Sequence, residues 1–277
     1  MIKTMTPDLM GILNITPDSF SGDGLFSAHF IDDALKKAER FLKEGACWLD
    51  IGGESTRPGF TPVSIEEELR RVVPVVEAIR KEFPDALLSV DTTKAKVAFE
   101  CLSLGIHMIN DVSGCLKDPE MIKSIAKSSV YVVPMHASKK PYEGEQVCQV
   151  PQDVFDAFWA TFLFQMQEIV TRMISFGIAK ERLILDPGIG FGTYLTENLL
   201  ILKGLEKLAS LGLPVLVGAS RKSFIGKITD SVVEKRLSGS LAVALFAAQK
   251  GCSILRVHDV LETKQCLDMW HALEHFA

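Results

Sequence analysis

Polar residues stand at or just beyond the ends of eight short apolar runs in this chain of 277 residues. They are Asn14, Asp50 with Glu54, Asp91, Asn110 with Asp111, His136, Asp186, Ser220 to Lys222, and Arg256 with His258. Any one of them is readily explained as a turn residue, because Asn, Asp and Ser favour the points where a strand becomes a loop. As a set they predict a ligand, since polar groups gathered in a partly dehydrated place are costly unless something satisfies them.

The chemistry of these side chains divides them into two groups. Asp91, Asn110 and Asp186 suit the amino-substituted edge of a flat heterocycle such as a pterin or guanine ring, since carboxylates accept hydrogen bonds and a carboxamide also donates. The last two runs contribute donors and positive charge suited to a phosphate group, from Ser220, Arg221, Lys222, Arg256 and His258. The alternative for Arg256 is a structural ion pair with an acid such as Asp259. The histidine two residues after Arg256 favours the anion site.

The apolar runs alternate with longer amphipathic stretches, as expected when strands alternate with covering helices. The predicted strands span Leu9 to Ile15, Trp48 to Gly52, Leu87 to Asp91, Met108 to Val112, Val130 to Met135, Leu183 to Asp186, Pro214 to Gly218 and Ile254 to Val257. The predicted helices span Ile31 to Glu44, Ile65 to Phe83, Lys94 to Leu104, Pro119 to Lys127, Val154 to Phe176, Glu197 to Leu211, Leu237 to Gln249 and Leu261 to His275.

Eight such units form either a doubly wound open sheet or a closed barrel. In a barrel all strand ends meet at one mouth, so chemistry is distributed over many strand ends, as it is here. The predicted fold is therefore α/β, a (β/α)8 TIM barrel, as a single domain over residues 1–277. The length agrees, because such a barrel needs roughly 250 residues.

The composition argues against several classes of partner and site. The formal net charge is −5 and the charges are dispersed, which argues against nucleic acid as a partner. The six cysteines are scattered without the paired spacing of a zinc site. No apolar run approaches the length of a membrane span, and the first residues lack the pattern of a secretory signal, so we expect a soluble cytoplasmic protein without membrane contact.

Several separate segments together resemble the dihydropteroate synthase family over nearly the whole chain. They are Met10 to Ser21, Asp50 to Gly59, Ser89 to Thr92, Ile109 to Val112, Asp186 to Gly192, Ser220 to Ser223 and Arg256 to Asp259. The resemblance implies that 6-hydroxymethyl-7,8-dihydropterin diphosphate is condensed with p-aminobenzoate to 7,8-dihydropteroate and diphosphate. It further implies an SN1-like substitution at the pterin methylene carbon, competition by sulfonamides, small-molecule substrates and a homodimer.

The same resemblance implies a role for each matching residue. The pterin would be held by Asp91, Asn110, Asp186 and Lys222. The diphosphate would be held by Asn14, Thr56, Arg256 and His258, with Mg2+ on Asn14. The p-aminobenzoate pocket would be formed by Phe20, Thr56, Arg57, Pro58, Phe191 and Ser223. The implied catalytic residues are Asn14, Asp23, Lys222, Arg256 and His258.

Three departures from the family pattern stand out, one of which is the stretch Ala137 to Tyr142 in place of the usual Met-His-x-x-Gly. The order Ser21-Gly22-Asp23-Gly24 displaces by one position the acid of the usual Ser-Asp-Gly-Gly, and Thr193 stands where the family usually has Lys. The altered first loop keeps open one alternative, a catalytically silent pterin-binding paralogue. A folate-dependent methyltransferase barrel is another, although it would not explain Ser220 to Ser223 with Arg256 and His258.

Overall fold

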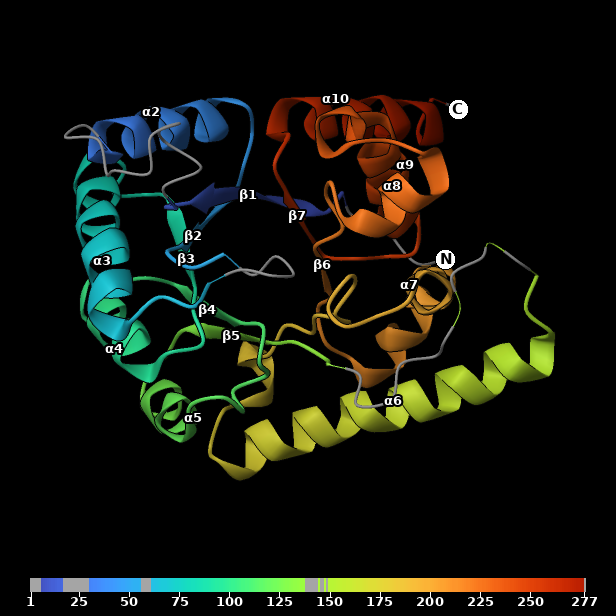
Figure 1. Cartoon of the computed structure of the whole chain (residues 1–277), viewed down its shortest axis with the longest axis horizontal. Coiled ribbons are helices and arrows are strands. Elements are labelled where there is room, and N and C mark those ends of the chain that lie inside the picture. The colour runs from blue at the N-terminus through green and yellow to red at the C-terminus, as the bar shows by residue number, and fades with distance from the viewer. Residues whose placement is uncertain are drawn as a thin grey trace.

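A ring of parallel strands surrounded by helices forms the molecule (Figure 1). The computed structural model describes residues 6–16, 30–55, 61–137, 144, 147 and 149–276. In chain order the elements are β1 (Asp8–Asn14), α2 (Phe30–Lys43), β2 (Trp48–Gly52), α3 (Ile65–Glu82), β3 (Leu87–Asp91), α4 (Ala95–Ser103), β4 (Met108–Asp111), α5 (Pro119–Ala126), β5 (Tyr131–Pro134), α6 (Gln152–Ser175), α7 (Leu195–Lys203), β6 (Leu216–Val217), α8 (Ser223–Thr229), α9 (Leu237–Gln249), β7 (Ile254–Val257) and α10 (Val260–Glu274). Short 3-10 helices lie at Lys180–Arg182, Leu205–Leu211 and Val233–Lys235.

The strands make up a nearly closed barrel. Within the described ranges, seven parallel strands pair in the order β5-β4-β3-β2-β1-β7-β6. The predicted strand at 183–186 bridges the gap, because Leu183 pairs with Val132 of β5 and Leu185 pairs with Val215 beside β6. These are isolated bridges instead of a continuous strand, and Pro214, which has no N–H to donate, opens the neighbouring run. The predicted barrel is confirmed, with its closing strand reduced to bridges.

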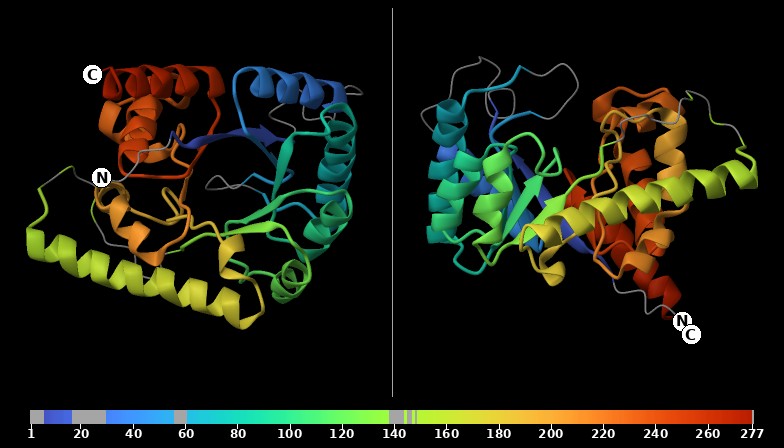
Figure 2. Two further views of the ribbon diagram at one scale, coloured as in Figure 1. Left: turned by 180° about the vertical axis from the view of Figure 1, so that it is seen from behind. Right: turned by 90° about the horizontal axis from the view of Figure 1, so that it is seen from below.

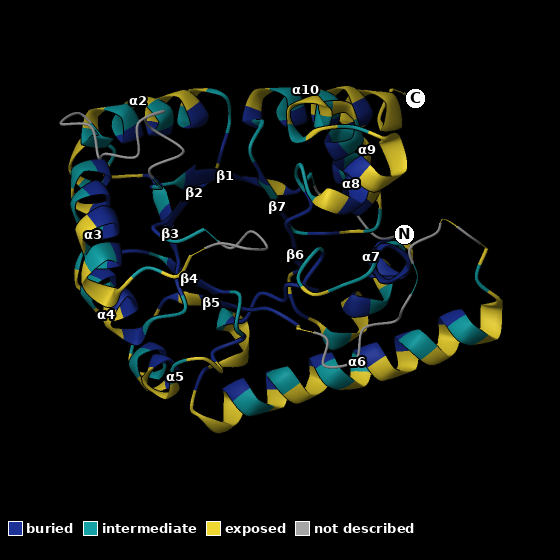
Figure 3. Ribbon diagram, viewed as in Figure 1, coloured by how far each residue is buried: buried dark blue, intermediate teal, exposed yellow. Residues whose placement is uncertain are grey.

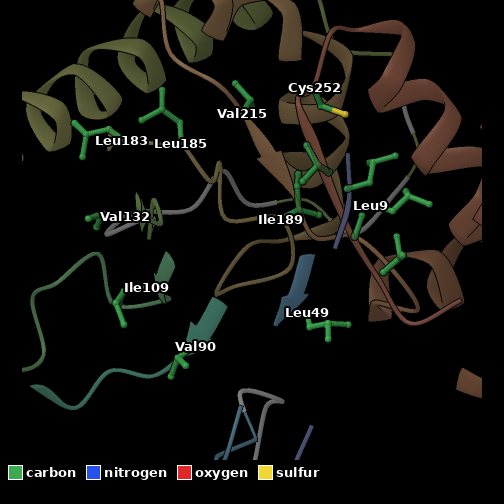
Figure 4. Packing of buried hydrophobic residues seen from close by; sticks show 14 of the residues in the cluster. Leu9, Leu49, Val90, Ile109, Val132, Leu183, Leu185, Ile189, Val215 and Cys252 are labelled. Atoms are coloured by element: carbon green, nitrogen blue, oxygen red, sulfur yellow. The ribbon is translucent and has the colours of Figure 1, made fainter. Parts of the chain in front are cut away.

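The interior of the barrel is filled by one apolar layer. Its members lie at inward positions of successive strands and form a cluster separate from the large outer core: Met10, Trp48, Leu87, Met108, Val133, Ile184, Leu216 and Ile254. Neighbouring residues along each strand, such as Leu49, Val90 and Ile109, belong to the outer core under the helices (Figure 4). This alternation follows from the two-residue period of a strand.

Two residues further along each strand, the side chains return to the barrel interior and most become polar. These residues, together with Asp91 at the next inward position of β3, form the polar layer: Ile12, Asp50, Ser89, Asp91, Asn110, Met135, Asp186, Gly218 and Arg256. The strands are therefore apolar at one end of the barrel and polar at the end where their carboxyl termini meet.

The helices cover the outside of the ring with one buried face each. Figure 3 shows the strands buried and the outer faces of the helices exposed. In α3 the Ser64 hydroxyl accepts a hydrogen bond from the amide of Glu67 at 3.2 Å, which caps the helix. Helix α6 spans 24 residues and runs along one side of the molecule in both views of Figure 2. No helix in the described ranges is both long and apolar enough to cross a membrane.

Two helical segments differ from the sequence-based prediction. The predicted helix Glu197 to Leu211 is divided into α7 and a 3-10 helix at Gly204, where a Cβ atom would lie 2.2 Å from the Trp159 ring nitrogen. Only glycine fits against that indole, and its backbone (φ −108°, ψ 21°) departs from α-helical geometry and ends α7. The short helix α8 follows β6 and was not predicted, because its seven residues are too few for a clear period.

Candidate active site

A network of buried charges crosses the polar layer of the barrel. Asp50 on β2 accepts hydrogen bonds from Ser89 Oγ at 2.6 Å and from Arg256 Nε at 2.6 Å. The same guanidinium donates from Nη2 to Asp91 at 2.7 Å. Asn110 Nδ2 approaches Asp50 at 3.5 Å. Four strands, β2, β3, β4 and β7, thus share one network, in which Arg256 serves two carboxylates.

The pKa values of this network follow from its burial. Burial raises the pKa of the Asp91 carboxyl to about 7, with the charge of Arg256 opposing the rise and that of Asp50 adding to it. Burial lowers the pKa of Arg256, but the two carboxylates outweigh this, and the net pKa lies above the usual value. Arg256 therefore stays charged.

Asn110 and Asp186 lie in the same layer and keep acceptor capacity. Both side chains are buried. Asp186 Oδ1 accepts from the Gly188 amide at 2.8 Å, whereas Asn110 Oδ1 has no hydrogen-bond partner among the described residues. A buried carbonyl oxygen without a donor is costly, so a donor on a ligand would be favoured here.

Lys222 reaches into the layer from the turn after β6. Its Nζ donates to the Ile189 carbonyl and lies 4.1 Å from the centroid of the Phe191 ring. Burial lowers the pKa of Lys222 to about 7, although the charge of Asp186 opposes this. Burial likewise raises the pKa of Asp186, opposed by Lys222.

A cavity of about 300 Å³ opens at the carboxyl ends of the strands beside this layer. It is lined by Ile12, Asn14, Ser55, Gly190, Phe191, Gly218, Ser220, Arg221, Lys222, Ser223, Val233, Arg236, Arg256 and His258. The charged lining residues are cationic, while Ile12, Phe191 and Val233 add apolar surface. Such a cavity suits an anionic ligand that also carries a ring.

The cationic side of the cavity is organised around His258 and Ser220. The Ser220 hydroxyl lies 3.2 Å from the His258 amide nitrogen and 3.1 Å from its Nδ1. Burial, together with the charges of Arg256 and Arg221, lowers the pKa of His258 to about 3, so the imidazole is neutral. Arg221 donates from Nε to Asp259 at 2.9 Å. The alternative prediction of an ion pair between Arg256 and Asp259 is therefore wrong. Asp259 pairs with Arg221, whereas Arg256 pairs with Asp50 and Asp91.

Most of the predicted site residues within the described ranges come together at this mouth. The cavity is lined by Asn14, Phe191, Lys222, Ser223, Arg256 and His258, and the layer beside it holds Asp91, Asn110 and Asp186. Five predicted residues lie outside the described residues: Phe20, Asp23, Thr56, Arg57 and Pro58.

Three strand-end residues have partners elsewhere, and some site residues were not predicted. Glu54 accepts from Lys94 Nζ at 2.7 Å, and Asp111 accepts from the Ser113 amide at 2.7 Å. His136 Nε2 lies 2.8 Å from Gln165 Oε1 on α6, and its ring contacts Phe162, so His136 packs under a helix. Ser89 and Arg236 were not predicted. The signal for Ser89 was a serine at an inward position two residues before Asp91, whereas Arg236 follows no strand and had no sequence signal.

Comparison with known proteins agrees with this geometry. Residues 10–258 match the family of pterin binding enzymes. The chain is 45% identical over 274 residues to the dihydropteroate synthase of Haemophilus influenzae, which covers 96% of this chain and 94% of that protein.

Two solved structures are similar over nearly the whole chain. Dihydropteroate synthase from Clostridium difficile in the presence of pteroic acid has a TM-score of 0.87 at 37% identity, covering 99% of this chain and 98% of that one. The Yersinia pestis dihydropteroate synthase in a sulfonamide drug complex has a TM-score of 0.83 at 42% identity, covering 99% and 96%. The chain therefore belongs to the dihydropteroate synthase family of pterin binding enzymes.

Proposed function

We propose that this chain catalyses the dihydropteroate synthase reaction. It joins the methylene carbon of 6-hydroxymethyl-7,8-dihydropterin diphosphate to the amino nitrogen of p-aminobenzoate and releases diphosphate. The observation that carries this proposal is the pairing, at one mouth, of a buried layer of acids and amide with a cationic cavity. Pteroic acid, present with the Clostridium difficile relative, contains the same pterin–aminobenzoate linkage.

The polar layer supplies the pterin subsite. Asp186 and Asp91 offer carboxylate acceptors to the amino and ring N–H donors of a pterin, and Asn110 Oδ1 is a further acceptor. Lys222 supplies a donor for a ring acceptor on the opposite side. Because these groups lie in a dehydrated layer, a ring that left one unpaired would be rejected.

The cationic cavity supplies the diphosphate subsite. His258, Ser220 and Arg256 lie together there, with neutral His258 available as a hydrogen-bond donor. In the free protein two Arg256 donors are taken by Asp50 and Asp91, so a phosphate oxygen would bind Arg256 through a remaining donor or displace a carboxylate. Charge stabilisation at the departing oxygen lowers the barrier most when it acts in the transition state.

Magnesium fits this subsite as an ion that arrives with the diphosphate. Among the described residues no group of three or more His, Cys, Asp or Glu side chains could hold a metal ion, but Asn14 lines the same cavity as His258. Mg2+ usually takes one or two protein oxygens and completes its shell with water and substrate phosphates. When bound to Asn14 and the diphosphate, it supplies positive charge to the leaving group.

The substitution needs no protein nucleophile. The carbon–oxygen bond to diphosphate breaks with its electron pair on oxygen, and the arylamine nitrogen then forms the new carbon–nitrogen bond and loses a proton. We propose an SN1-like course, because the electron-rich pterin delocalises the positive charge on the methylene carbon. The carboxylates of Asp91 and Asp186 favour that charge electrostatically.

The second substrate binds at the outer part of the same cavity. Phe191 and Ser223 line it, and the proposed pocket is completed by Phe20, Thr56, Arg57 and Pro58. We propose that Thr56 also contacts the diphosphate and that Asp23 assists catalysis. Sulfonamides should compete with p-aminobenzoate here, as the Yersinia pestis complex suggests for that relative.

The assembly and location of the protein are further proposals. We propose a homodimer, because the family resemblance implies one, and a cytoplasmic location. The proposed partners are the two small substrates, with neither nucleic acid nor membrane. Light scattering coupled to gel filtration checks the dimer.

A product assay tests the proposed function. Purified protein is incubated with the pterin diphosphate, labelled p-aminobenzoate and magnesium, and dihydropteroate and diphosphate are quantified. Equal amounts of both products are expected. Binding of the pterin diphosphate without product would instead identify a silent paralogue, and methyl transfer from a folate would identify the methyltransferase alternative.

A further inference from the structure

Three successive residues of the loop before α7 enclose the side chain of Lys222. Ile189 accepts a hydrogen bond from Nζ, and the Phe191 ring lies 4.1 Å from that nitrogen. Between them, a Cβ atom on Gly190 would lie 2.6 Å from Lys222 Cδ, and the φ of Gly190 is +77°. The loop therefore fits Lys222 closely at the point where both proposed substrates meet.

This loop is fastened to α7 by a buried amide side chain. Asn198 Oδ1 accepts the Gly190 N–H at 2.7 Å and the Thr193 hydroxyl at 2.9 Å. Its Nδ2 donates to the Tyr194 carbonyl at 2.8 Å. Asn198 is 1% exposed, whereas its partners Gly190, Thr193 and Tyr194 are half-buried, so water has limited access to these bonds.

Thr193 is a second hydrogen-bond acceptor for the Gly190 backbone amide. Its hydroxyl oxygen lies 3.1 Å from the Gly190 nitrogen, so the Gly190 N–H is shared between Thr193 and Asn198. A hydroxyl both accepts from Gly190 and donates to Asn198, which closes a small ring of hydrogen bonds.

We propose that Asn198, assisted by Thr193, is a positioning residue for the pterin subsite, acting through Gly190 on Lys222 and Phe191. Neither side chain lines the cavity, and the polar atoms of both are engaged by hydrogen bonds within the loop and α7. Without the Asn198 carboxamide, the half-buried Gly190 N–H loses its shorter hydrogen bond, and the loop moves away from Lys222. This inference rests on the proposed function, because it assumes that Lys222 binds the pterin.

The matched control breaks a different buried hydrogen bond to the same helix. Trp159 Nε1 donates to the Leu200 carbonyl of α7 at 3.0 Å, and both are buried. Trp159→Phe removes that bond without touching Gly190, Thr193 or Asn198. It therefore reports what loosening α7 does on its own.

The experiment measures pteroic acid affinity by titration calorimetry, together with KM and kcat, for Asn198→Ala, Thr193→Val and Trp159→Phe. Asn198→Ala is expected to bind pteroic acid on the order of tenfold more weakly, since tenfold corresponds to about 1.4 kcal/mol, the scale of one lost hydrogen bond. Its KM for the pterin diphosphate should rise by a similar factor, while kcat falls by less than about threefold. Thr193→Val should weaken binding about threefold, and Trp159→Phe should lower the melting temperature with unchanged affinity.

Wild-type affinity in both Asn198→Ala and Thr193→Val would contradict the positioning role, as would an equal loss in Trp159→Phe. If Asn198→Ala does not fold, the nearly isosteric Thr193→Val carries the test. Failure of the proposed function is distinguishable, because it appears as wild-type protein that forms no dihydropteroate, whereas affinity is read without turnover.

Discussion

Asp186 and His258 belong to different halves of the same mouth, and their substitutions should separate binding from turnover. Asp186 is a buried acceptor in the polar layer, whereas His258 lies with Ser220 in the cationic cavity. Asp186→Asn should weaken pterin binding at least about a hundredfold, because a charged acceptor becomes partly a donor facing a ring donor. His258→Ala should mainly lower kcat. Calorimetry and steady-state kinetics check this, and an equal loss of pterin affinity in both variants would contradict the division.

The altered pKa of Lys222 should appear in the pH dependence of stability. Burial lowers this pKa from 10.5 to about 7, so between these values the unfolded chain binds a proton that the folded protein does not. The stability linked to Lys222 is therefore complete above pH 10.5 and is lost as the pH falls through about 7. Urea unfolding of Lys222→Met should lack this dependence, so the wild type should gain stability relative to the variant between pH 7 and pH 10.

An exposed lysine provides the control for that measurement. The Lys36 side chain is 76% exposed, and Lys36→Met should leave the pH profile of the wild type unchanged. Parallel profiles for wild type and Lys222→Met would show that Lys222 titrates as a free lysine, contrary to its burial beside Phe191.

At the scale of elements, an ion cluster fastens the end of β2 to α3 and the start of α4. Lys94 Nζ donates to Glu54 at 2.7 Å and also to Glu68, which is 0% exposed. Glu54 accepts in addition the Val63 N–H at 2.9 Å, so residues on both sides of 55–62 are tied to one carboxylate. The cluster fixes the position of Glu54, and the next residue, Ser55, lines the cavity.

Removing Lys94 alone should lower the free energy of unfolding more than removing Lys94 together with Glu68. Lys94→Met leaves Glu68 buried and unpaired, which should cost about 3 kcal/mol of unfolding free energy. Adding Glu68→Met removes the stranded charge, so the double variant should be at least as stable as Lys94→Met. Chemical denaturation measures both, and additive losses would contradict the buried pairing.

The element scale also shows what sequence could and could not predict. Asp91, Asn110 and Asp186 were identified because a polar residue closing an apolar run is visible in sequence. The contact between Arg256 and Asp50 was not, because 206 residues separate them and only barrel closure brings them together. Asn198 gave no signal, since a polar residue inside a helix ordinarily faces solvent. His136 had the same strand-end signal as the site residues, but packing against α6 turned it outward.

At the scale of the whole molecule, the apolar layer inside the barrel supports the polar layer above it. Ile184 belongs to this layer, on the segment that closes the ring by bridges. Ile184→Ala should cost about 2–5 kcal/mol, because the surrounding strands cannot collapse into the space. Met269→Ala, at a position 59% exposed on α10, should change stability by less than about 0.5 kcal/mol. Thermal or urea unfolding checks the contrast, and similar losses at both positions would contradict a packed interior.

The central claim is that the polar layer at the carboxyl ends of the strands holds the pterin ring. The position of pteroic acid in a crystal structure of its complex with this protein tests that claim most directly. We predict the pteridine ring within hydrogen-bond distance of Asn110, Asp186 and Lys222, with the aminobenzoyl group toward Phe191. A ring bound outside the barrel mouth, or at the opposite rim beyond Met108 and Ile254, would contradict it.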